Sequence, residues 1–304
     1  MTQPYVKPTE ALEVPAVDPR RLEAHVRMLS ETLVPRDHRH VENLDRAARY
    51  IAQALRESGA GVEEQPFEVE GRVYRNVIAR FGPVSGALVV VGAHYDAYEE
   101  LPGADDNASG VAGLLELARL LGAHPPEGEV ELVAYTLEEP PYFRSENMGS
   151  ARHASSLKSR NVDVRAMLAL EMIGYFSEEA GSQHLPIKLV EPVYPDRGNF
   201  VAVVGRLADG QLTRTVEAAM QGATPLAVCS LNAPRDVRGV DLSDHHAYWD
   251  AGFPALMVTD TAFFRNEAYH TAGDTADRLD YARMAQVVRG VWAAVRSLTA
   301  PGSP

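Results

Sequence analysis

The sequence predicts an α/β protein: a three-layer α/β/α sandwich with a central, mostly parallel mixed sheet. Short apolar segments such as 87–94 and 166–170 are typical of strands buried on both faces. They alternate along the chain with amphipathic helical segments such as 107–121, an order that places helices on both faces of one sheet. The 304 residues suffice for one large domain, expected over residues 19–304 after an extended, proline-rich arm at 1–18.

The first part of the domain is expected to be helical and then to form two strands. Apolar residues recur at helical spacing between 21 and 58, with a break near Pro35, and Gly59 ends this segment. Pro66 lacks a backbone N–H and therefore restricts the first strand to a sheet edge. The two strands are expected at 62–67 and 74–81.

The rest of the chain continues the alternation of short apolar strands and helices. Apolar periodicity predicts a long closing helix at 281–298. The segment 181–198 is rich in proline and polar residues and is expected to be a surface excursion rather than a domain boundary. The other strands are expected at 87–94, 130–136, 166–170, 200–204, 225–229 and 255–258, and the other helices at 107–121, 148–157 and 211–220.

Composition excludes several classes of protein. Lys and Arg total 29 against 42 Asp and Glu, a net charge of −13, which argues against a nucleic-acid partner and against an anionic membrane surface. The sequence contains no apolar run of about 18 residues, the length that a membrane-spanning helix needs, so no membrane span is expected. Cys229 is the only cysteine, so an intrachain disulfide and a four-cysteine zinc site are both impossible. The first residues lack the apolar segment of a signal peptide, so a cytoplasmic location is expected, with a removed leader as the alternative.

Candidate metal ligands collect where the expected strands end, which is where open α/β sheets place their sites. His94 closes a buried strand, and Asp96 lies two residues on, so in extended geometry both side chains point to the same side. A carboxylate placed in this way can accept the second imidazole N–H and fix the tautomer of a metal-binding histidine. The alternative is a solvated polar pair at a strand end.

Two pairs of acidic residues follow other expected strands. Asp105 and Asp106 precede a helix, and adjacent carboxylates repel each other unless cations or N–H donors face them. Helix N-capping is the alternative for this pair. Glu138 and Glu139 directly follow a strand, so one can bind a metal while the other faces the water on that metal, as metal-assisted hydrolysis requires. The alternative for them is a solvated acidic loop.

Three further positions complete the set of polar candidates. Glu171 ends an apolar strand, where a carboxylate is costly to bury unless it is paired or bound to a cation. His270 lies in a loop before the last helix, where a lone histidine is usually a loop residue. Ser243 is expected to cap a helix whose two following histidines face solvent.

Together these positions supply two histidines and several carboxylates from separate strand ends. In a chain without a cysteine cluster, this donor set suits Zn²⁺, with Co²⁺ or Mn²⁺ as substitutes, at a hydrolytic site with an open position. Two metal ions that share a carboxylate would clamp both the attacking water and the substrate oxygen.

The ordered set of motifs resembles peptidase family M28, the co-catalytic zinc aminopeptidases, over about residues 43–298. Each motif alone is unspecific, whereas the ordered set is highly specific. The motifs are His94-Tyr-Asp96, Gly103-Ala-Asp-Asp-Asn-Ala-Ser-Gly110, Glu138-Glu139, Glu171-Met172, Ser243-Asp-His245 and Tyr269-His270-Thr271.

The resemblance implies metal ligands at five positions. His94 and Glu171 would bind one zinc ion, Glu139 and His270 would bind the other, and Asp106 would bridge the two. The better-known aminopeptidases carry Asp where this chain has Glu171, so the longer side chain puts equal occupancy of the two sites in question.

The resemblance also implies the groups around the metal ions. Glu138 would be the general base, and Asp96 would orient the first histidine ligand. Tyr269 would hydrogen-bond the tetrahedral oxyanion. Asp244 and His245 match a polar pair at the rim of the site, and the peptide bond between Asp106 and Asn107 is expected to be cis, as in relatives.

The expected function is a zinc-dependent exopeptidase, foremost an aminopeptidase acting on a peptide or aminoacyl substrate. Glutaminyl cyclases share the fold but typically use one zinc ion, so retention of His94 together with Asp106 and Glu139 favours the peptidase. Carboxypeptidase or dipeptidase action is a further alternative. The last alternative is a non-catalytic binding module on the same fold. Receptor-like relatives of that kind have lost metal ligands, whereas this chain keeps them.

Several residues near the motifs are candidates for contacts with the substrate. Arg265 could contact a substrate carboxylate, which would favour dipeptides or carboxypeptidase action, and Asn266 beside it is a second candidate. The alternative for Arg265 is an ion pair with a structural acid. Apolar residues near the motifs are candidates for a pocket lining, with core packing as their alternative. They are Tyr142, Phe143, Met172, Ile173, Phe263 and Phe264.

Overall fold

The computed structural model describes residues 6–9, 13–84, 86–186 and 192–302. The expected arm at 1–18 and the excursion at 181–198 therefore lie partly outside the described residues. Within the described part of the chain, no helix is long and apolar enough to cross a membrane.

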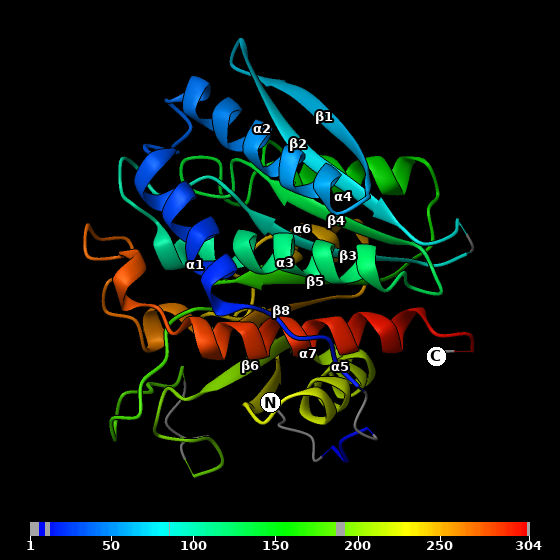
Figure 1. The fold of residues 1–304 in the computed structure, drawn as a ribbon, viewed down its shortest axis with the longest axis vertical. Helices are drawn as coiled ribbons and strands as arrows, with labels where there is room; N and C mark the ends of the chain where they lie inside the picture. The colour runs from blue at the N-terminus through cyan, green and yellow to red at the C-terminus, as the bar shows by residue number, and fades with distance from the viewer. Residues whose placement is uncertain (1–5, 10–12, 85, 187–191, 303–304) are drawn as a thin grey trace.

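One mixed sheet runs through the molecule, with the strand order β1-β2-β4-β3-β5-β8-β6-β7 (Figure 1). Four strands form a parallel core of the sheet, in which β3 pairs with β4 and β5, and β5 pairs with β8. β6 runs parallel to β7. The pairs β1–β2, β2–β4 and β6–β8 are antiparallel. The strands are β1 (Gly61–Val69), β2 (Arg72–Phe81), β3 (Leu88–His94), β4 (Val130–Tyr135), β5 (Val164–Glu171), β6 (Phe200–Arg206), β7 (Ala227–Ala233) and β8 (Ala255–Thr259).

Helices cover both faces of this sheet, which confirms the predicted three-layer α/β/α sandwich. Figure 1 shows α1, α3 and α7 in front of the sheet and α4 and α6 behind it. The helices are α1 (Pro19–Arg27), α2 (Val41–Glu57), α3 (Gly110–Ala123), α4 (Gly149–Ser159), α5 (Gly210–Ala223), α6 (His245–Ala251) and α7 (Tyr281–Thr299).

β3 illustrates why a continuous apolar segment predicts a central strand. Val89 and Val91 pack into the core under α3 and α7, whereas Val90, pointing the other way, packs into the core under α4 and α6. Pro66 lies in β1, which is an edge strand as the missing N–H requires.

The parallel strands β3, β4, β5 and β8 end at one edge of the sheet, and the polar motifs follow their ends. The helix expected from residue 107 begins instead at Gly110, because Asp106 and Asn107 have non-helical backbone angles. The peptide bond between these two residues is cis, as expected. The side chain of Asn107 accepts hydrogen bonds from the backbone N–H groups of Gly110 and Met172 at 3.1 and 3.0 Å. This side chain therefore ties the start of α3 to the end of β5.

A buried arginine supports the loops beside the same edge. Arg36 is fully buried, and its guanidinium donates hydrogen bonds to the backbone carbonyls of Tyr95, Pro102 and Gly103 at 2.9–3.0 Å. These carbonyls belong to the segment that leads from β3 to Asp106, so Arg36 holds that segment in place.

Candidate metal centre

Asp106 lies between two histidine side chains. Its Oδ1 is 3.4 Å from Nε2 of His94, and its Oδ2 is 3.1 Å from Nε2 of His270. His94 ends β3, whereas His270 comes from the loop before α7, so the carboxylate joins segments far apart in the sequence. This arrangement allows one carboxylate to serve two neighbouring cations.

Two groups of three donors meet at this carboxylate. His94, Asp106 and Glu171 place one possible ligand atom each within 4.8 Å of one another, and Asp106, Glu139 and His270 do the same. Glu171 Oε2 lies 3.3 Å from His94 Nε2, and Glu139 Oε2 lies 3.3 Å from His270 Nε2. The structure thus brings together all five residues that the resemblance implied as ligands.

The chemistry of these donors fits zinc. Nε2 of His94, Nε2 of His270 and Oε1 of Glu139 are buried and make no well-aligned hydrogen bond to the described residues. Buried polar atoms without partners are costly, and bound cations would satisfy them. Imidazole nitrogens combined with carboxylate oxygens form the donor set that zinc takes in hydrolytic sites.

Without a bound cation, Glu139 and His270 at this centre both have raised pKa values. Burial raises the pKa of Glu139 to about 8, with the neighbouring Asp106 charge adding to the effect. Burial alone would lower the pKa of His270, but its contacts with Asp106 and Glu139 raise that pKa to about 10. Because ligands must be deprotonated, metal binding at this centre releases protons.

Asp96 connects the histidine of one group with the glutamate of the other. Nδ1 of His94 lies 3.2 Å from the carbonyl oxygen of Asp96 and 3.5 Å from its Oδ1. The Asp96 carboxylate accepts hydrogen bonds from the backbone N–H groups of Glu138 and Glu139 at 3.2 and 3.1 Å. Asp96 therefore positions the ends of β3 and β4 relative to each other.

Glu138 belongs to neither donor group. Its side chain is buried, and its Oε2 lies 3.8 Å from Nε2 of His94. Burial raises the pKa of Glu138 well above its usual range, and the carboxylates of Glu139 and Glu171 add to this shift against the opposing effect of His94. A carboxylate beside a metal site with a raised pKa is suited to take up and release a proton.

The ring of His270 is held by two tyrosines. The ring of Tyr269 stacks on it at a centroid distance of 3.8 Å, and the ring of Tyr98 stacks on it at 4.1 Å. Sequence reasoning found Tyr269 but missed Tyr98. The available signal for Tyr98 was its place two residues after Asp96, which is weak without the fold.

The segment 243–246 differs from the expectation of a capped helix with solvent-facing histidines. Ser243 Oγ donates to Glu171 Oε2 at 2.7 Å, so this hydroxyl supports a candidate ligand rather than a helix end. His245 and His246 are buried, not exposed. His245 Nε2 contacts the carbonyl oxygen of Val240 at 2.8 Å, so the first residue of α6 is bonded to the preceding loop and lies outside both donor groups.

Asp244 stays close to the centre. It is buried, and burial raises its pKa to about 7, an effect that the charge of His94 opposes. Asp244 is therefore a carboxyl group close to His94 that can hold a proton in the absence of a cation.

Arg265 and Asn266 are held by the protein itself. Arg265 is buried and donates to Gln183 Oε1 at 2.8 Å and to the Phe200 carbonyl at 2.9 Å. Asn266 Nδ2 donates to Asp105 Oδ2 at 2.8 Å. Both residues thus brace the loops that carry the candidate ligands.

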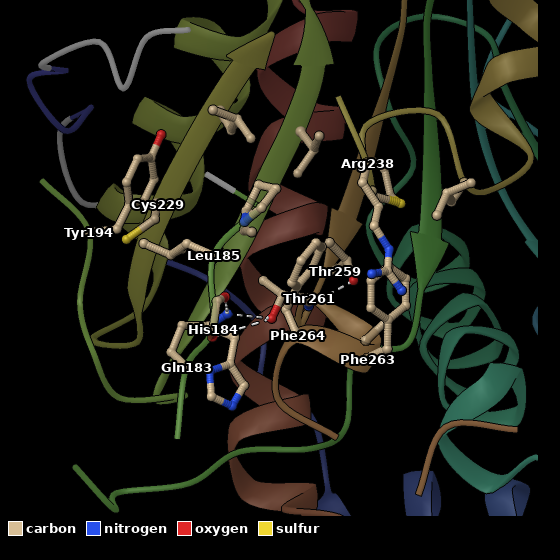
Figure 2. A pocket seen from close by; sticks show the side chains of 18 of the residues that line it. Gln183, His184, Leu185, Tyr194, Cys229, Arg238, Thr259, Thr261, Phe263 and Phe264 are labelled. Carbon is tan, nitrogen blue, oxygen red and sulfur yellow. Dashed lines mark hydrogen bonds between the residues drawn. The ribbon is translucent and has the colours of Figure 1, made fainter. Parts of the chain in front are cut away.

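A mainly apolar pocket opens beside the metal centre (Figure 2). Glu171 and Tyr269 contribute to its wall, and it encloses about 80 Å³. Phe263 and Phe264 line it as expected. Four other candidates are absent from the described lining and are buried or half-buried elsewhere: Tyr142, Phe143, Met172 and Ile173.

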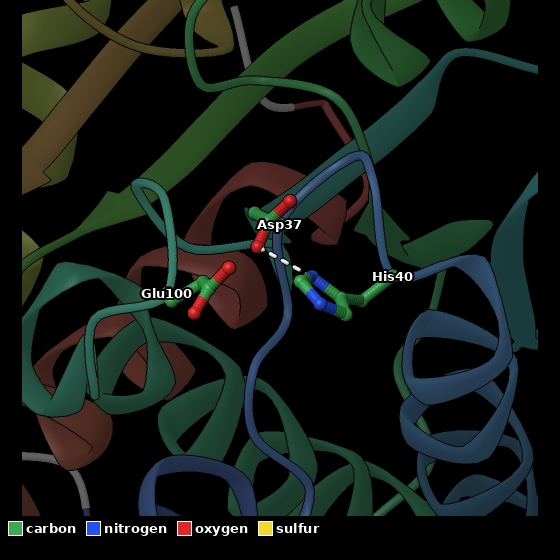
Figure 3. Close-up of side chains that lie close together, drawn as sticks. All are labelled: Asp37, His40 and Glu100. Atoms are coloured by element: carbon green, nitrogen blue, oxygen red, sulfur yellow. Dashed lines mark hydrogen bonds and ion pairs between the residues drawn. The ribbon is translucent and has the colours of Figure 1, made fainter.

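A third group of possible donors lies away from this centre. Asp37, His40 and Glu100 approach one another in Figure 3. Arg39 already donates to Asp37 Oδ1 at 3.1 Å and lies 3.9 Å from Glu100. Since an arginine supplies the positive charge, we assign no metal to this group.

Comparisons with known proteins agree with this geometry. Residues 76–295 match peptidase family M28. The chain is 51% identical to "Uncharacterized protein YfbL" of Escherichia coli (strain K12), over 90% of this chain and 86% of that protein. It is 27% identical to Leucine aminopeptidase 1 of Ajellomyces capsulatus, over 78% of this chain, and spans 59% of that protein's length.

Solved structures share the fold at low sequence identity. A zinc aminopeptidase from Bacillus subtilis superimposes with a TM-score of 0.73 at 17% identity, over 93% of this chain and 96% of that chain. A glutaminyl cyclase from Bacteroides thetaiotaomicron gives a TM-score of 0.70 at 19% identity, over 93% of this chain and 99% of that chain. The ordered motifs, the shared fold and the match over most of the sequence lead to one conclusion: this chain belongs to peptidase family M28.

Proposed function

We propose that this protein is a zinc-dependent aminopeptidase that removes an apolar N-terminal residue from peptides. The observation that carries the proposal is the pair of donor groups that share Asp106, with Glu138 beside them and outside both. A shared carboxylate with a free neighbouring glutamate is what hydrolysis at a two-metal site requires.

Five residues would hold the metal ions. His94 and Glu171 would bind one zinc ion, Glu139 and His270 the other, and Asp106 both. Zinc bound there would polarise the scissile carbonyl and lower the pKa of the attacking water.

Glu138 is the proposed general base. It takes a proton from the water as the new C–O bond forms, and it returns the proton to the leaving amine as the C–N bond breaks. Asp96 supports this role because it fixes the backbone of Glu138 through a hydrogen bond. The raised pKa makes Glu138 a stronger base than an exposed glutamate.

Tyr269 is the proposed oxyanion donor. Burial raises its pKa above the usual value for a tyrosine, and the nearby carboxylates of Asp106 and Glu139 add to the shift. The phenol therefore stays protonated and can donate a hydrogen bond to the oxygen on which negative charge develops.

The charge of the centre supports action at the N-terminus of a peptide. Glu138 and Asp244 are buried beside the proposed ligands and outside both donor groups, and bound zinc would favour their ionised forms. An ammonium group is favoured at such a place over a carboxylate. The apolar pocket beside Glu171 and Tyr269 is suited to the side chain of the N-terminal residue.

A substrate panel tests this proposal. Zinc-loaded protein should hydrolyse leucyl-alaninamide faster than alanyl-alaninamide and should not hydrolyse the N-acetylated peptide, because acetylation removes the ammonium group. Glu138→Gln should lose roughly 10²–10⁴-fold in kcat, whereas Glu146→Gln, a change at an exposed acid nearby, should not.

Two other results would replace the proposal. Cyclisation of a glutaminyl peptide without hydrolysis of leucyl peptides would indicate a glutaminyl cyclase. Hydrolysis of N-acetylated peptides that carry a free C-terminus would indicate a carboxypeptidase.

A further inference from the structure

Arg238 lies in the wall of the apolar pocket, where its guanidinium is exposed. Its guanidinium carbon lies 4.6 Å from the centroid of the Phe263 ring. Figure 2 shows Arg238 and Phe263 on one side of the pocket, across from Leu185 and Tyr194. Among the described residues, no carboxylate forms an ion pair with Arg238.

Two charged residues close to Arg238 in the sequence form ion pairs with other residues, and the exposed Asp236 forms none with Arg238 among the described residues. Arg235, three residues earlier, pairs with Asp250 at 2.8 Å. Asp241, three residues later, pairs with Arg144. Within the described part of the chain, Arg238 is thus a cation without an ion pair beside the pocket, in a protein whose net charge is −13.

The backbone beside Arg238 is shaped to hold it there. Gly239 has φ +91°, and a Cβ atom at this position would lie 2.6 Å from Cε2 of Phe264. Glycine therefore lets the loop pack directly on the Phe264 ring. The Phe263 ring in turn contacts the ring of Tyr269 at a centroid distance of 5.5 Å, which links the position of Arg238 to the metal centre.

The balance of apolar and charged groups determines which part of a substrate Arg238 can contact. A carboxylate in the apolar depth of the pocket, away from the exposed Arg238, would lose its hydration without compensation. A carboxylate at the solvent-exposed part of the pocket wall, where Arg238 lies, keeps water and gains a charge-assisted hydrogen bond. The carboxylate must then belong to the part of the substrate that lies beyond the apolar side chain.

We infer that Arg238 binds the C-terminal carboxylate of a dipeptide whose apolar N-terminal side chain occupies the pocket. This inference rests on the proposed function and narrows its substrate to short peptides with a free C-terminus. It assigns to Arg238 the contact that the sequence suggested for Arg265, which is instead buried and bonded to Gln183 and Phe200.

Paired substrates test this inference. Wild-type protein should cleave leucyl-alanine with a higher kcat/KM than leucyl-alaninamide. Arg238→Gln should lose roughly 10- to 100-fold in kcat/KM on the free acid, mainly through KM, and change less than about twofold on the amide. Arg238→Lys keeps the charge, so its kcat/KM on the free acid should lie between the values of the wild-type protein and of Arg238→Gln. The matched control Arg235→Gln should leave the ratio of acid to amide unchanged. Equal losses on both substrates, or no loss, would overturn the inference.

A binding measurement separates this inference from the proposed function. The Glu138→Gln protein and the Glu138→Gln/Arg238→Gln protein are titrated with the same two peptides by calorimetry, without turnover. Tighter binding of the free acid than of the amide, abolished by Arg238→Gln, supports the inference even if the wild-type protein hydrolyses neither peptide. Equal binding of acid and amide by both proteins contradicts it even if leucyl peptides are hydrolysed.

Discussion

The carboxylate of Asp96 accepts a hydrogen bond from the backbone N–H of Glu138 at 3.2 Å. The same residue contacts His94 Nδ1 through its carbonyl oxygen at 3.2 Å. A single residue just after β3 therefore holds a proposed metal ligand through its backbone carbonyl and the proposed general base through its carboxylate. Its importance is a consequence of the parallel pairing of β3 and β4, which brings the two strand ends together.

Replacement of Asp96 should impair the centre without removing a ligand. Asp96→Ala should reduce zinc affinity or kcat by roughly 10- to 100-fold, because supporting partners of metal ligands have effects of that size. Asp96→Asn keeps one acceptor oxygen and should lose less. Zinc titration and steady-state kinetics measure both quantities. Wild-type values in Asp96→Ala would show that the hydrogen bonds to the glutamate pair do not matter.

Removal of the Tyr269 hydroxyl should slow the chemical step. Tyr269→Phe keeps the ring that stacks on His270 but removes the proposed donor to the oxyanion, so kcat should fall by roughly 10²–10³-fold with less change in KM. Tyr98→Phe is the matched control, since its ring also stacks on His270 and should give nearly normal kcat. Similar kcat values for the two variants would remove Tyr269 from the mechanism.

A larger side chain in the pocket wall should change specificity. Ala202 lies in β6, is buried and lines the pocket, so Ala202→Leu should reduce the space for a substrate side chain. We expect kcat/KM for a leucyl substrate to fall by about 10-fold or more, with a smaller loss for an alanyl substrate. Ala202→Ser, which adds a single oxygen atom, is the control. Parallel losses on both substrates would indicate that the pocket does not bind the N-terminal side chain.

The buried His245 should make the protein less stable in mild acid. Burial lowers the pKa of His245 to about 3, so below about pH 6.5 the unfolded chain binds a proton that the folded chain does not. The free energy of unfolding should therefore fall as the pH decreases from 6.5 towards 3, by up to about 1.4 kcal/mol per pH unit from this residue.

Urea unfolding of His245→Gln measures this contribution. The glutamine amide can still donate to the Val240 carbonyl but does not titrate, so the variant should lose less stability than wild type between pH 6.5 and 4. His184→Gln, at an exposed histidine, should follow wild type. Parallel pH profiles for wild type and His245→Gln would exclude His245 as the source.

The predicted fold and the ligand motifs share one physical origin. Buried parallel strands need continuous apolar segments, and the polar residue that follows each segment necessarily lies at the same edge of the sheet. His94, Glu139 and Glu171 were therefore recognisable from sequence, and the structure brings them together. The helix start at Gly110 was placed three residues too early, because apolar periodicity does not register the non-helical angles at Asp106 and Asn107.

Residues whose role depends on packing between distant segments were not predictable in the same way. His245 and His246 were expected to face solvent, but α6 packs against the sheet and buries them. Arg238 and Tyr98 carry no local motif, and their place beside the centre follows only from the folding of their loops. Arg265 had a recognisable position before Tyr269 and His270, yet its burial and its hydrogen bonds depend on Gln183 and Phe200 from other parts of the chain.

Zinc stoichiometry is the most direct test of the shared carboxylate at Asp106. Native mass spectrometry of the wild-type protein, titrated with zinc after removal of all metal, should show two ions bound per chain. His270→Ala, which removes a ligand from one donor group only, should show one tightly bound ion. A wild-type protein that saturates at one zinc ion, or that binds none, would contradict the proposed two-metal aminopeptidase.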